Sequence, residues 1–574
     1  MENDKGSADT SAGQAAGAAI AVGATATATT IAVSGGIEQG LGSQPIGGSV
    51  AEFENSLGFS VLPPENVSLS QASRFLGQAT CGANRQDIEH LASIGYNAWL
   101  NEQFAMPRGR SHWRWMKSRN IEDDPRHAIN GRGKRFWDAS IWRQLIASHD
   151  QLRQRVALAL LDTMVVGIEG LSERWPQFAM AAYMDLLLDN AFGNYRDLIG
   201  AITKSSAMAQ YLTYLSSSRE DGSGTMPDEN YARELMQLFT IGLHQLKQNG
   251  ELRLGKDEPL PAFTQDDVTQ LAKIFTGLRL QSNDLSTPDV HRRPLVIDPR
   301  ANETGDVYFL RHKISGGGME AVDAALDVLF MHPNTPPFFA RTLIRRLVSS
   351  NPSRHYINRV AATFIDDGTG QRGDMKAVIK AVLTDPEARS EGALTAPHTG
   401  KVRDPILRLT NWARAFGARS RNGTWYIGNL SSPDRGLGQS PGRSPSVFHF
   451  FRPGFSPPQS ELSRRGLVAP ELQIANEQSV ISYINFMAIT IRKGAARGDI
   501  KANYSYLLGL STNAAALLNE VDLILAGGQL SSERRKLIAG ALNNMRDDDL
   551  RTKLNRVRAA ILLTMVSPDY LVLK

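Results

Sequence analysis

Apolar residues recur at helical spacing along most of this chain, and this periodicity constrains the fold more than any other feature of the sequence. The pattern starts near Asn66 and is broken at short intervals by turn residues. Apolar positions three and four residues apart share one face of an α-helix, so each interval predicts a helix with one buried side. The sequence therefore predicts a mainly α fold, with one large multi-helix domain over residues 67–574. The clearest intervals are 151–166, 176–190, 230–241, 264–276, 320–331, 335–348 and 374–383.

Cap residues indicate where several of these helices begin and end. Asn84 precedes an apolar stripe that Gly95 is placed to stop, and Thr264 stands before two aspartates. Asn and Thr accept hydrogen bonds from the first free amides of a helix, and glycine adopts the conformation that ends one. These positions predict a helix start at Asn84, a helix end at Gly95 and a second start at Thr264.

Two segments depart from the helical pattern. The β-branched runs PLVID and VYFLRH, within residues 294–312, predict a small β-hairpin inserted among the helices. Residues 418–475 are rich in Gly, Pro, Ser and Arg, which predicts a long irregular segment that serves a function or is disordered. The resulting sub-blocks are 67–285, 286–390, an irregular 391–475 and 476–574.

Residues 1–66 form a low-complexity segment rich in Ala, Gly and Thr. Its first nine residues carry three acidic side chains and one lysine, which is the wrong charge for the start of a signal peptide. The uncharged stretch that follows is only weakly hydrophobic, so we expect no transmembrane helix. The segment is interpreted as a disordered tail, with a degenerate signal or a membrane anchor as alternatives.

Charge, cysteine content and missing motifs exclude several classes of protein. The net charge is +5 over 574 residues, which is too small to require a nucleic-acid partner. Cys81 is the only cysteine, so neither an internal disulfide nor a zinc site built from paired cysteines is available. The sequence contains no phosphate-binding loop, zinc-protease helix or nucleophile elbow. No cofactor is implied.

The most concentrated charged feature lies within residues 107–144, where arginines alternate with tryptophans. Basic side chains beside aromatic platforms bind anionic polymers by charge and stacking. The competing interpretation is a segment whose aromatic side packs on the body while its guanidinium groups face solvent. The polymer-binding candidates are Arg108, Arg110, Trp113, Arg114, Trp115 and Arg119.

A second set of candidates could serve a hydrolase-like enzyme. Glu234 follows Arg233 in a predicted helix whose other side is apolar, so it is either an acid or base near a cleft or part of an interhelical ion pair. A late loop with three phenylalanines (448, 450, 451) is interpreted as a lid that plugs the core, with a ligand cradle as the alternative. The catalytic candidates are Arg233, Glu234, His312 and Arg443, and His332 is interpreted as part of a helix-start turn.

An ordered series of segments resembles the domain of unknown function (DUF) 1800 family. The series includes SRFLGQATCGANRQDIEHL, GNYRDLIGAIT, NYARELMQLFTIGL, DDVTQLAKIFTGL, HPNTPPFFARTLIRRLVSSNPS, VRDPILRLTNWARAF, GQSPGRSPSVFHFFRP and RVRAAILLTMVSPDYLV, spread over residues 67–571. The resemblance implies a mostly α-helical bacterial protein. It also implies that members with a signal sequence are exported, often encoded beside a sulfatase-like DUF 1501 protein.

Many members of that family carry histidines that look like a metal or acid/base constellation. At the corresponding positions this chain has Leu161, Thr163 and Phe239, and the family's later His-Asp pair reads His312 and Lys313. One remaining imidazole is too little for a first-row metal site. We therefore expect no bound metal.

These observations leave three hypotheses for function. The first is a periplasmic or extracellular protein with a binding or assembly role, beside a DUF 1501 partner or an extracellular polymer; a cytoplasmic location is the alternative. The second is a hydrolase-like enzyme, which requires the four catalytic candidates to share a pocket. The third is anionic-polymer binding by the Arg/Trp segment, which requires an exposed cationic stripe.

Overall fold

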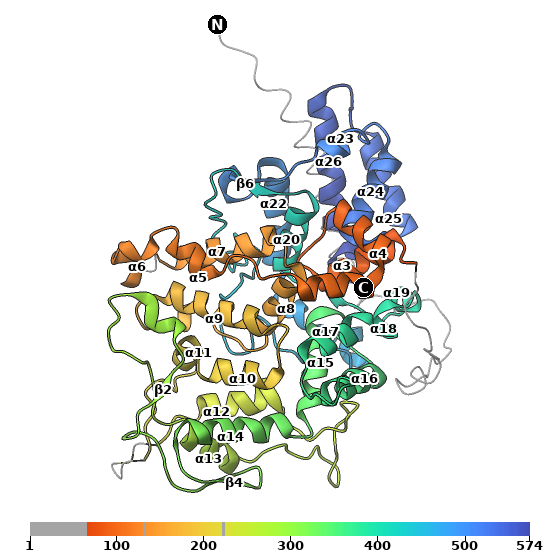
Figure 1. Ribbon diagram of the computed structural model, residues 1–574. Coiled ribbons are helices and arrows are strands. Elements are labelled where there is room, and N and C mark those ends of the chain that lie inside the picture. The colour runs from red at the N-terminus through yellow and green to blue at the C-terminus, as the bar shows by residue number, and fades with distance from the viewer. Residues whose placement is uncertain (1–65, 130–132, 221–223, 225) are drawn as a thin grey trace.

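The computed structural model describes residues 66–129, 133–220, 224 and 226–574. The predicted N-terminal tail thus lies outside the described residues apart from Asn66. Helices make up most of the described chain, and every sheet in it has only two strands, which confirms the mainly α fold. Figure 1 shows the helices packed around one another without a central sheet.

The first half of the chain contributes helices that form the middle and one end of the molecule (Figure 1). They are α3 (Leu69–Ala79), α4 (Arg85–Ala105), α5 (His112–Lys117), α6 (Arg126–Ile129), α7 (Lys134–Ala147), α8 (Gln151–Leu161), α9 (Pro176–Asn190), α10 (Tyr195–Thr203), α11 (Ser206–Tyr211), α12 (Asn230–Glu234) and α13 (Gln265–Ile274). Short 3-10 helices include η2 (Ile168–Gly170) and η4 (Pro288–Arg292).

The second half continues the same architecture. Its helices are α14 (Gly318–Met331), α15 (Thr335–Leu347), α16 (Arg354–Ile365), α17 (Met375–Thr384), α18 (Pro386–Arg389), α19 (Gly392–Thr395), α20 (Pro405–Ala415), α21 (Glu461–Arg464), α22 (Glu477–Lys493), α23 (Ser505–Leu508), α24 (Ala514–Ala526), α25 (Ser532–Asn543), α26 (Leu550–Met565) and α27 (Pro568–Leu571). Helix α24 packs against α3, so the two ends of the described chain lie side by side (Figure 1).

The predicted caps are in place. Asn84 and Thr264 each form a capping box with an aspartate three residues later, Asp87 and Asp267. Gly95 adopts φ 80° and interrupts α4, which resumes after it, so glycine ends only the first part of this helix. A residue without a Cβ reaches this left-handed region at little cost.

One predicted helix changes its winding part-way. Residues 230–241 begin as α12 and continue as a π-helix (η3, Leu235–Thr240). The Ile241 amide donates to the Met236 carbonyl at 2.9 Å, five residues back. The Thr240 hydroxyl donates to the Leu235 carbonyl at 2.6 Å, again five residues back. Apolar spacing does not distinguish the two windings over so short a segment.

The β structure differs in detail from the single predicted hairpin. Strands β3 (Val307–Phe309) and β4 (His312–Ile314) form a hairpin, whereas β2 (Val296–Ile297) pairs with β1 (Leu278–Arg279), a segment not predicted as a strand. Two further pairs join β5 (Lys401–Val402) to β8 (Val572–Leu573) and β6 (Arg419–Ser420) to β7 (Ile500–Lys501). Two-residue strands are too short to produce an alternating pattern in the sequence.

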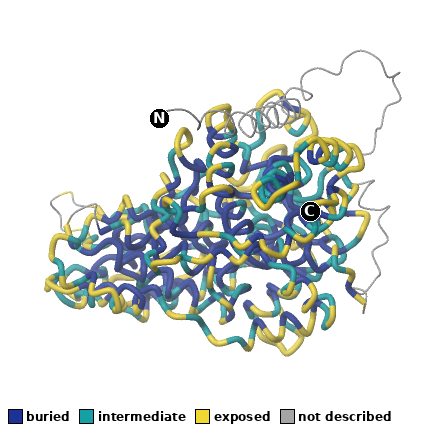
Figure 2. Tube along the Cα trace, turned by 90° about the horizontal axis from the view of Figure 1, so that it is seen from above, coloured by how far each residue is buried: buried dark blue, intermediate teal, exposed yellow. Residues whose placement is uncertain are grey.

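Buried side chains form one continuous core through the body, which appears dark blue in Figure 2. The irregular segment takes part in it, because residues 436–444 are all buried. Gly442 adopts φ 64°, and a Cβ there would lie 2.6 Å from the Trp137 ring. This part of the segment therefore plugs the core. None of the helices in the described part of the chain has the length and apolar character needed to cross a membrane.

Candidate functional site: a cationic groove

An open groove of about 1230 Å³ lies between α5, α9, α10 and η4, with one residue from α14 at its edge. Helix α9 contacts α5, α10 and η4, so it forms the base on which the other walls are assembled. Small residues such as Ala182, Gly200 and Ala201 line part of the surface and leave it open. Charged side chains surround these small residues.

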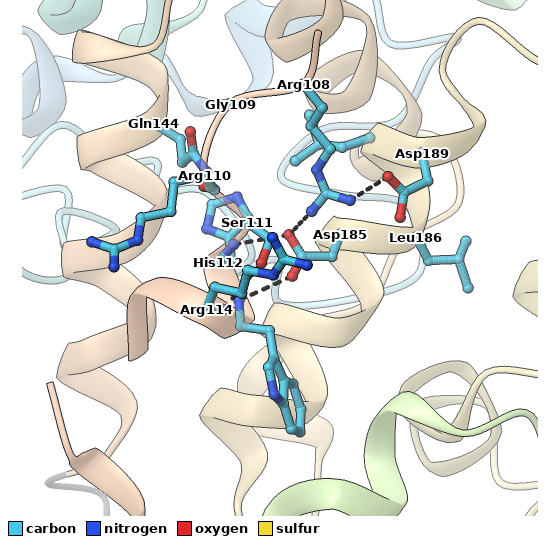
Figure 3. A network of polar contacts seen from close by, with 12 residues as sticks. Arg108, Gly109, Arg110, Ser111, His112, Arg114, Gln144, Asp185, Leu186 and Asp189 are labelled. Atoms are coloured by element: carbon cyan, nitrogen blue, oxygen red, sulfur yellow. Dashed lines mark hydrogen bonds and ion pairs between the residues drawn. The ribbon is translucent and has the colours of Figure 1, made fainter. Parts of the chain in front are cut away.

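Asp185 of α9 organises one wall of the groove. Its carboxylate accepts hydrogen bonds from the backbone amides of His112 and Trp113, both at 2.9 Å, and it forms an ion pair with Arg108. Arg108 also binds Asp189 one turn further along α9 (Figure 3). A carboxylate at a helix N-terminus satisfies free amides and interacts favourably with the helix dipole. Asp185 thus fixes both α5 and Arg108 against α9.

The surroundings of Asp185 change its acidity. Burial raises the pKa of its carboxyl to about 6, against the opposing effect of Arg108 and of the two backbone amides. Asp189 adds a smaller increase. His112 follows the lining residue Ser111 in the chain and is buried. Burial lowers the pKa of its imidazole well below the usual value. The Asp185 carboxyl can therefore change its charge just below neutral pH.

The groove has more cations than anions. Seven Arg and Lys side chains line it against four aspartates, a surplus of three, whereas the whole chain carries +5. Arg196 and Lys204 are engaged with Asp323. The exposed side chains of three lining arginines form no ion pair or hydrogen bond with any described residue. These three are Arg110, Arg114 and Arg293.

The structure divides the predicted Arg/Trp candidates into three kinds. Arg108, Arg110 and Arg114 line the groove, and Arg108 is already paired. Trp113, which also lines the groove, and Trp115 are only 6% and 4% exposed and pack mostly into the body, so they offer little surface for stacking. Arg119 lies outside the groove, with its guanidinium 5.3 Å from the Trp115 ring centre. Charge, without aromatic platforms, is what the segment presents to solvent.

The predicted catalytic residues do not share this groove. Arg233 binds Glu229 of the preceding turn at 2.9 Å and Gln265 of α13 at 3.0 Å, so it ties two helices together. Glu234 is 7% exposed, and its Oε2 accepts no hydrogen bond from a described residue. Burial raises the pKa of Glu234. The expected interhelical ion pair is therefore not seen among the described residues: Arg233 pairs with Glu229 four residues earlier, and Glu234 has no ion-pair partner.

The two other catalytic candidates lie in different surroundings. His312 is exposed on β4, close enough to His332 to help burial lower the pKa of His332 to about 4. Arg443 is buried and binds Asp138 of α7 through two hydrogen bonds of 3.0 and 2.7 Å. Figure 1 shows α7 far from β4. The four candidates therefore do not converge. The His332 carbonyl accepts the Thr335 amide, as expected of a helix-start turn.

Two of the three positions that the resemblance aligns with the family's histidines lie in the core. Leu161 and Phe239 are buried at 2% and 1% exposure. Asp162, between two of these positions, lies 2.9 Å from Nε2 of His449, which the irregular segment supplies. Within the described ranges, no three His, Cys, Asp or Glu side chains are placed to hold a metal ion. The metal content of the chain stays a prediction.

A family model described as "protein of unknown function (DUF1800)" matches residues 74–572, nearly the whole chain. The chain belongs to the DUF1800 family. No curated protein and no solved structure matches it. Membership establishes a shared sequence pattern over the helical body of this DUF1800 protein and leaves its activity open.

Sequence reasoning missed the groove residues that come from outside the Arg/Trp segment of this DUF1800 protein. Arg292 ends η4, Arg293 follows it and Lys204 follows α10, all more than eighty residues from Arg110 along the chain. The run HRRP at 291–294 was the available signal, because adjacent arginines beside a proline suggest an exposed turn. No such signal pointed to Asp185, because a single acidic residue on an apolar helix has no diagnostic spacing.

Proposed function

We propose that this protein is a binding protein for an anionic polymer and that the groove between α5, α9, α10 and η4 is its binding site. The observation that carries the proposal is the presence in one open groove of exposed arginines without acidic partners among the described residues, namely Arg114 and Arg293, with Arg110 at the edge of the groove. Guanidinium groups bind carboxylates, sulfates and phosphates through paired hydrogen bonds. An open groove of about 1230 Å³ is much larger than a small anion and has room for several units of a chain.

A binding role agrees with the leading expectation from the sequence. The hydrolase alternative has less support, because Arg233, Glu234, His312 and Arg443 stand in separate surroundings. A periplasmic or extracellular location and a DUF 1501 partner remain part of the proposal on the strength of the family resemblance alone. An acidic polymer of the cell envelope or its surroundings is the ligand that such a location would offer.

Heparin is a suitable first probe because it is a flexible, densely charged polymer. We expect it to bind with an affinity that falls steadily as sodium chloride is raised, since each neutralised charge releases a counterion. The double variant Arg114→Gln/Arg293→Gln should bind roughly tenfold more weakly, as each exposed ion pair contributes up to about 1 kcal/mol. Isothermal titration calorimetry at two salt concentrations measures both effects.

A matched control separates the groove from general attraction to a cationic protein. Arg551 is exposed on α26, away from the groove, and its side chain forms no ion pair or hydrogen bond with a described residue. Arg551→Gln removes the same kind of charge and should leave the affinity unchanged within twofold. Equal losses in Arg551→Gln and in each groove variant would contradict a defined site in the groove.

A further inference from the structure

A second group of arginines lies on the α7 side of α5. It consists of Arg110 before α5, Arg119 after it and Arg143 in α7, and we refer to these three residues as the arginine ledge. Arg143 is half-buried, and its guanidinium stands 5.9 Å from the Trp115 ring centre. Figure 3 shows the Arg110 guanidinium turned away from Asp185 and from the Arg108 pair. Arg110 is also a lining residue of the groove.

The arginine ledge contains no acidic side chain. The groups whose charges act on Arg143 are Arg110 and Arg119, and both lower its pKa, after burial, which is the largest cause. Arg119 donates one hydrogen bond, to the neutral carbonyl of Gly423 at 2.6 Å. Within the described residues, no carboxylate forms an ion pair with any of the three.

Three neighbouring guanidinium groups without a counter-charge raise the free energy of the folded protein. Like charges repel, and partial burial removes the water that would otherwise screen Arg143. An anion placed among the three groups would relieve both costs and could be held by more than one guanidinium. The cluster thus has the chemistry of a binding site for a carboxylate, sulfate or phosphate group.

The geometry points to the arginine ledge as a second anion subsite, continuous with the groove through Arg110, so that one acidic polysaccharide chain crosses α5 and contacts both. This inference rests on the proposed function, because the groove supplies the first subsite. Two subsites that share Arg110 select for ligands with several charges along one chain. A short acidic sugar can occupy the groove alone, whereas a longer one also reaches Arg143 and Arg119.

A polysaccharide fits these subsites better than a nucleic acid does. Proteins that bind single-stranded nucleic acid stack bases on exposed aromatic rings. The nearest rings here are covered, with Arg292 5.5 Å from the Trp113 ring centre and Arg119 and Arg143 over Trp115. Tyr426 is 40% exposed, but Arg135 lies 5.5 Å from its ring centre. Sulfate and carboxylate groups on a sugar chain need the guanidinium groups alone.

The test compares heparin fragments of two lengths on matched variants of the full chain. A disaccharide and a decasaccharide are titrated into the wild type, Arg143→Gln, Arg119→Gln, Arg114→Gln and the control Arg551→Gln. We expect Arg143→Gln and Arg119→Gln each to weaken decasaccharide binding about threefold to fivefold and to leave disaccharide binding unchanged. Arg114→Gln should weaken both ligands. A thermal melt of each variant establishes that it is folded, and Arg119→Gln serves if Arg143→Gln does not fold.

The outcomes separate the two proposals. If Arg114→Gln weakens decasaccharide binding while Arg143→Gln and Arg119→Gln match the control, the groove stands and the ledge subsite is wrong. If neither fragment binds the wild type, the proposed function itself fails. Tighter binding of single-stranded DNA of equal charge than of the decasaccharide would overturn the assignment to a polysaccharide.

Discussion

The groove and the core around the irregular segment both contain charged side chains, but these side chains are paired in the core and partly unpaired in the groove. In the core, Lys401 is 3% exposed and binds Asp404 at 2.9 Å and Glu471 at 3.0 Å. Arg443 is also buried and binds the buried Asp138, together with Glu169, whose side chain is exposed. In the groove, by contrast, Arg114 and Arg293 face solvent without an acidic partner among the described residues.

This contrast distinguishes charge that stabilises the fold from charge that is available to a ligand. A buried ion that loses its partner is costly, so the core arginine and lysine are held in fixed pairs. An exposed arginine costs little when unpaired and stays free to bind an anion. The number of arginines in a region therefore says less about binding than the number that lack a partner.

The largest expected effect comes from breaking a core pair. Arg443→Ala should reduce the free energy of unfolding by about 3–5 kcal/mol, because it leaves Asp138 buried and unpaired. Urea denaturation followed by circular dichroism measures the loss. Arg435→Ala is the control, since the Arg435 side chain is 87% exposed and pairs with Asp434 alone among the described residues. This variant should cost less than about 1 kcal/mol. Equal stability of the two variants would remove the distinction between core and surface charge.

Glu234 tests the same distinction, because it is a buried acid whose Oε2 accepts no hydrogen bond from a described residue. Burial raises its folded-state pKa above the ordinary 4.5, so its ionisation costs stability once the pH rises above the unfolded value. Glu234→Gln should therefore be more stable than the wild type by about 1 kcal/mol at pH 7 and equal to it below about pH 4.5. Melting curves of the variant and the wild type at both pH values measure this difference in stability. A destabilised variant at pH 7 would show that the carboxylate is paired in solution.

A smaller effect is expected from Asp185 in the wall of the groove. The pKa of Asp185 is about 6, so lowering the pH from 7.5 to 5 neutralises it, loosens Arg108 and makes the groove more positive. Heparin, whose sulfates stay ionised, should then bind severalfold more tightly. Asp185→Asn should bind tightly at both pH values. A wild type whose affinity is unchanged by pH would mean that Asp185 is ionised throughout.

The smallest expected signal is the metal content. With Leu161, Thr163 and Phe239 at the family's histidine positions, protein purified without a histidine tag should hold well under one Zn, Mn or Fe per chain. Elemental analysis checks this. About one metal per chain that disappears in His312→Ala would place a third kind of charged site in the molecule and would favour the enzyme hypothesis.

The fold could be predicted where local sequence decides it. The interval 176–190 coincides with α9, and Asn84 and Thr264 cap helices as expected. The change to a π-helix after Glu234 and the pairing of β1 with β2 escaped prediction. Both depend on packing and hydrogen bonds that neither periodicity nor propensity records.

The site could be predicted only in part. The Arg/Trp segment identified Arg110 and Arg114, because an unusually high local density of arginines can be recognised from the sequence alone. It did not show that Trp113 and Trp115 are buried, nor that η4 brings Arg293 to the same groove. Which arginine finds a carboxylate is settled by contacts between distant segments, such as Arg443 with Asp138, 305 residues apart.

Helix α5 has only six residues, far below the length at which an isolated helix persists in water. Its order therefore comes from contacts outside itself, chief among them the two amides held by Asp185. A ligand that bridges the groove and the arginine ledge would hold α5 from both sides. Hydrogen–deuterium exchange should therefore slow at the amides of His112–Lys117 when such a ligand binds, and should slow far less at the amides of α26. The exchange rate of this short helix would then report whether the ligand is bound.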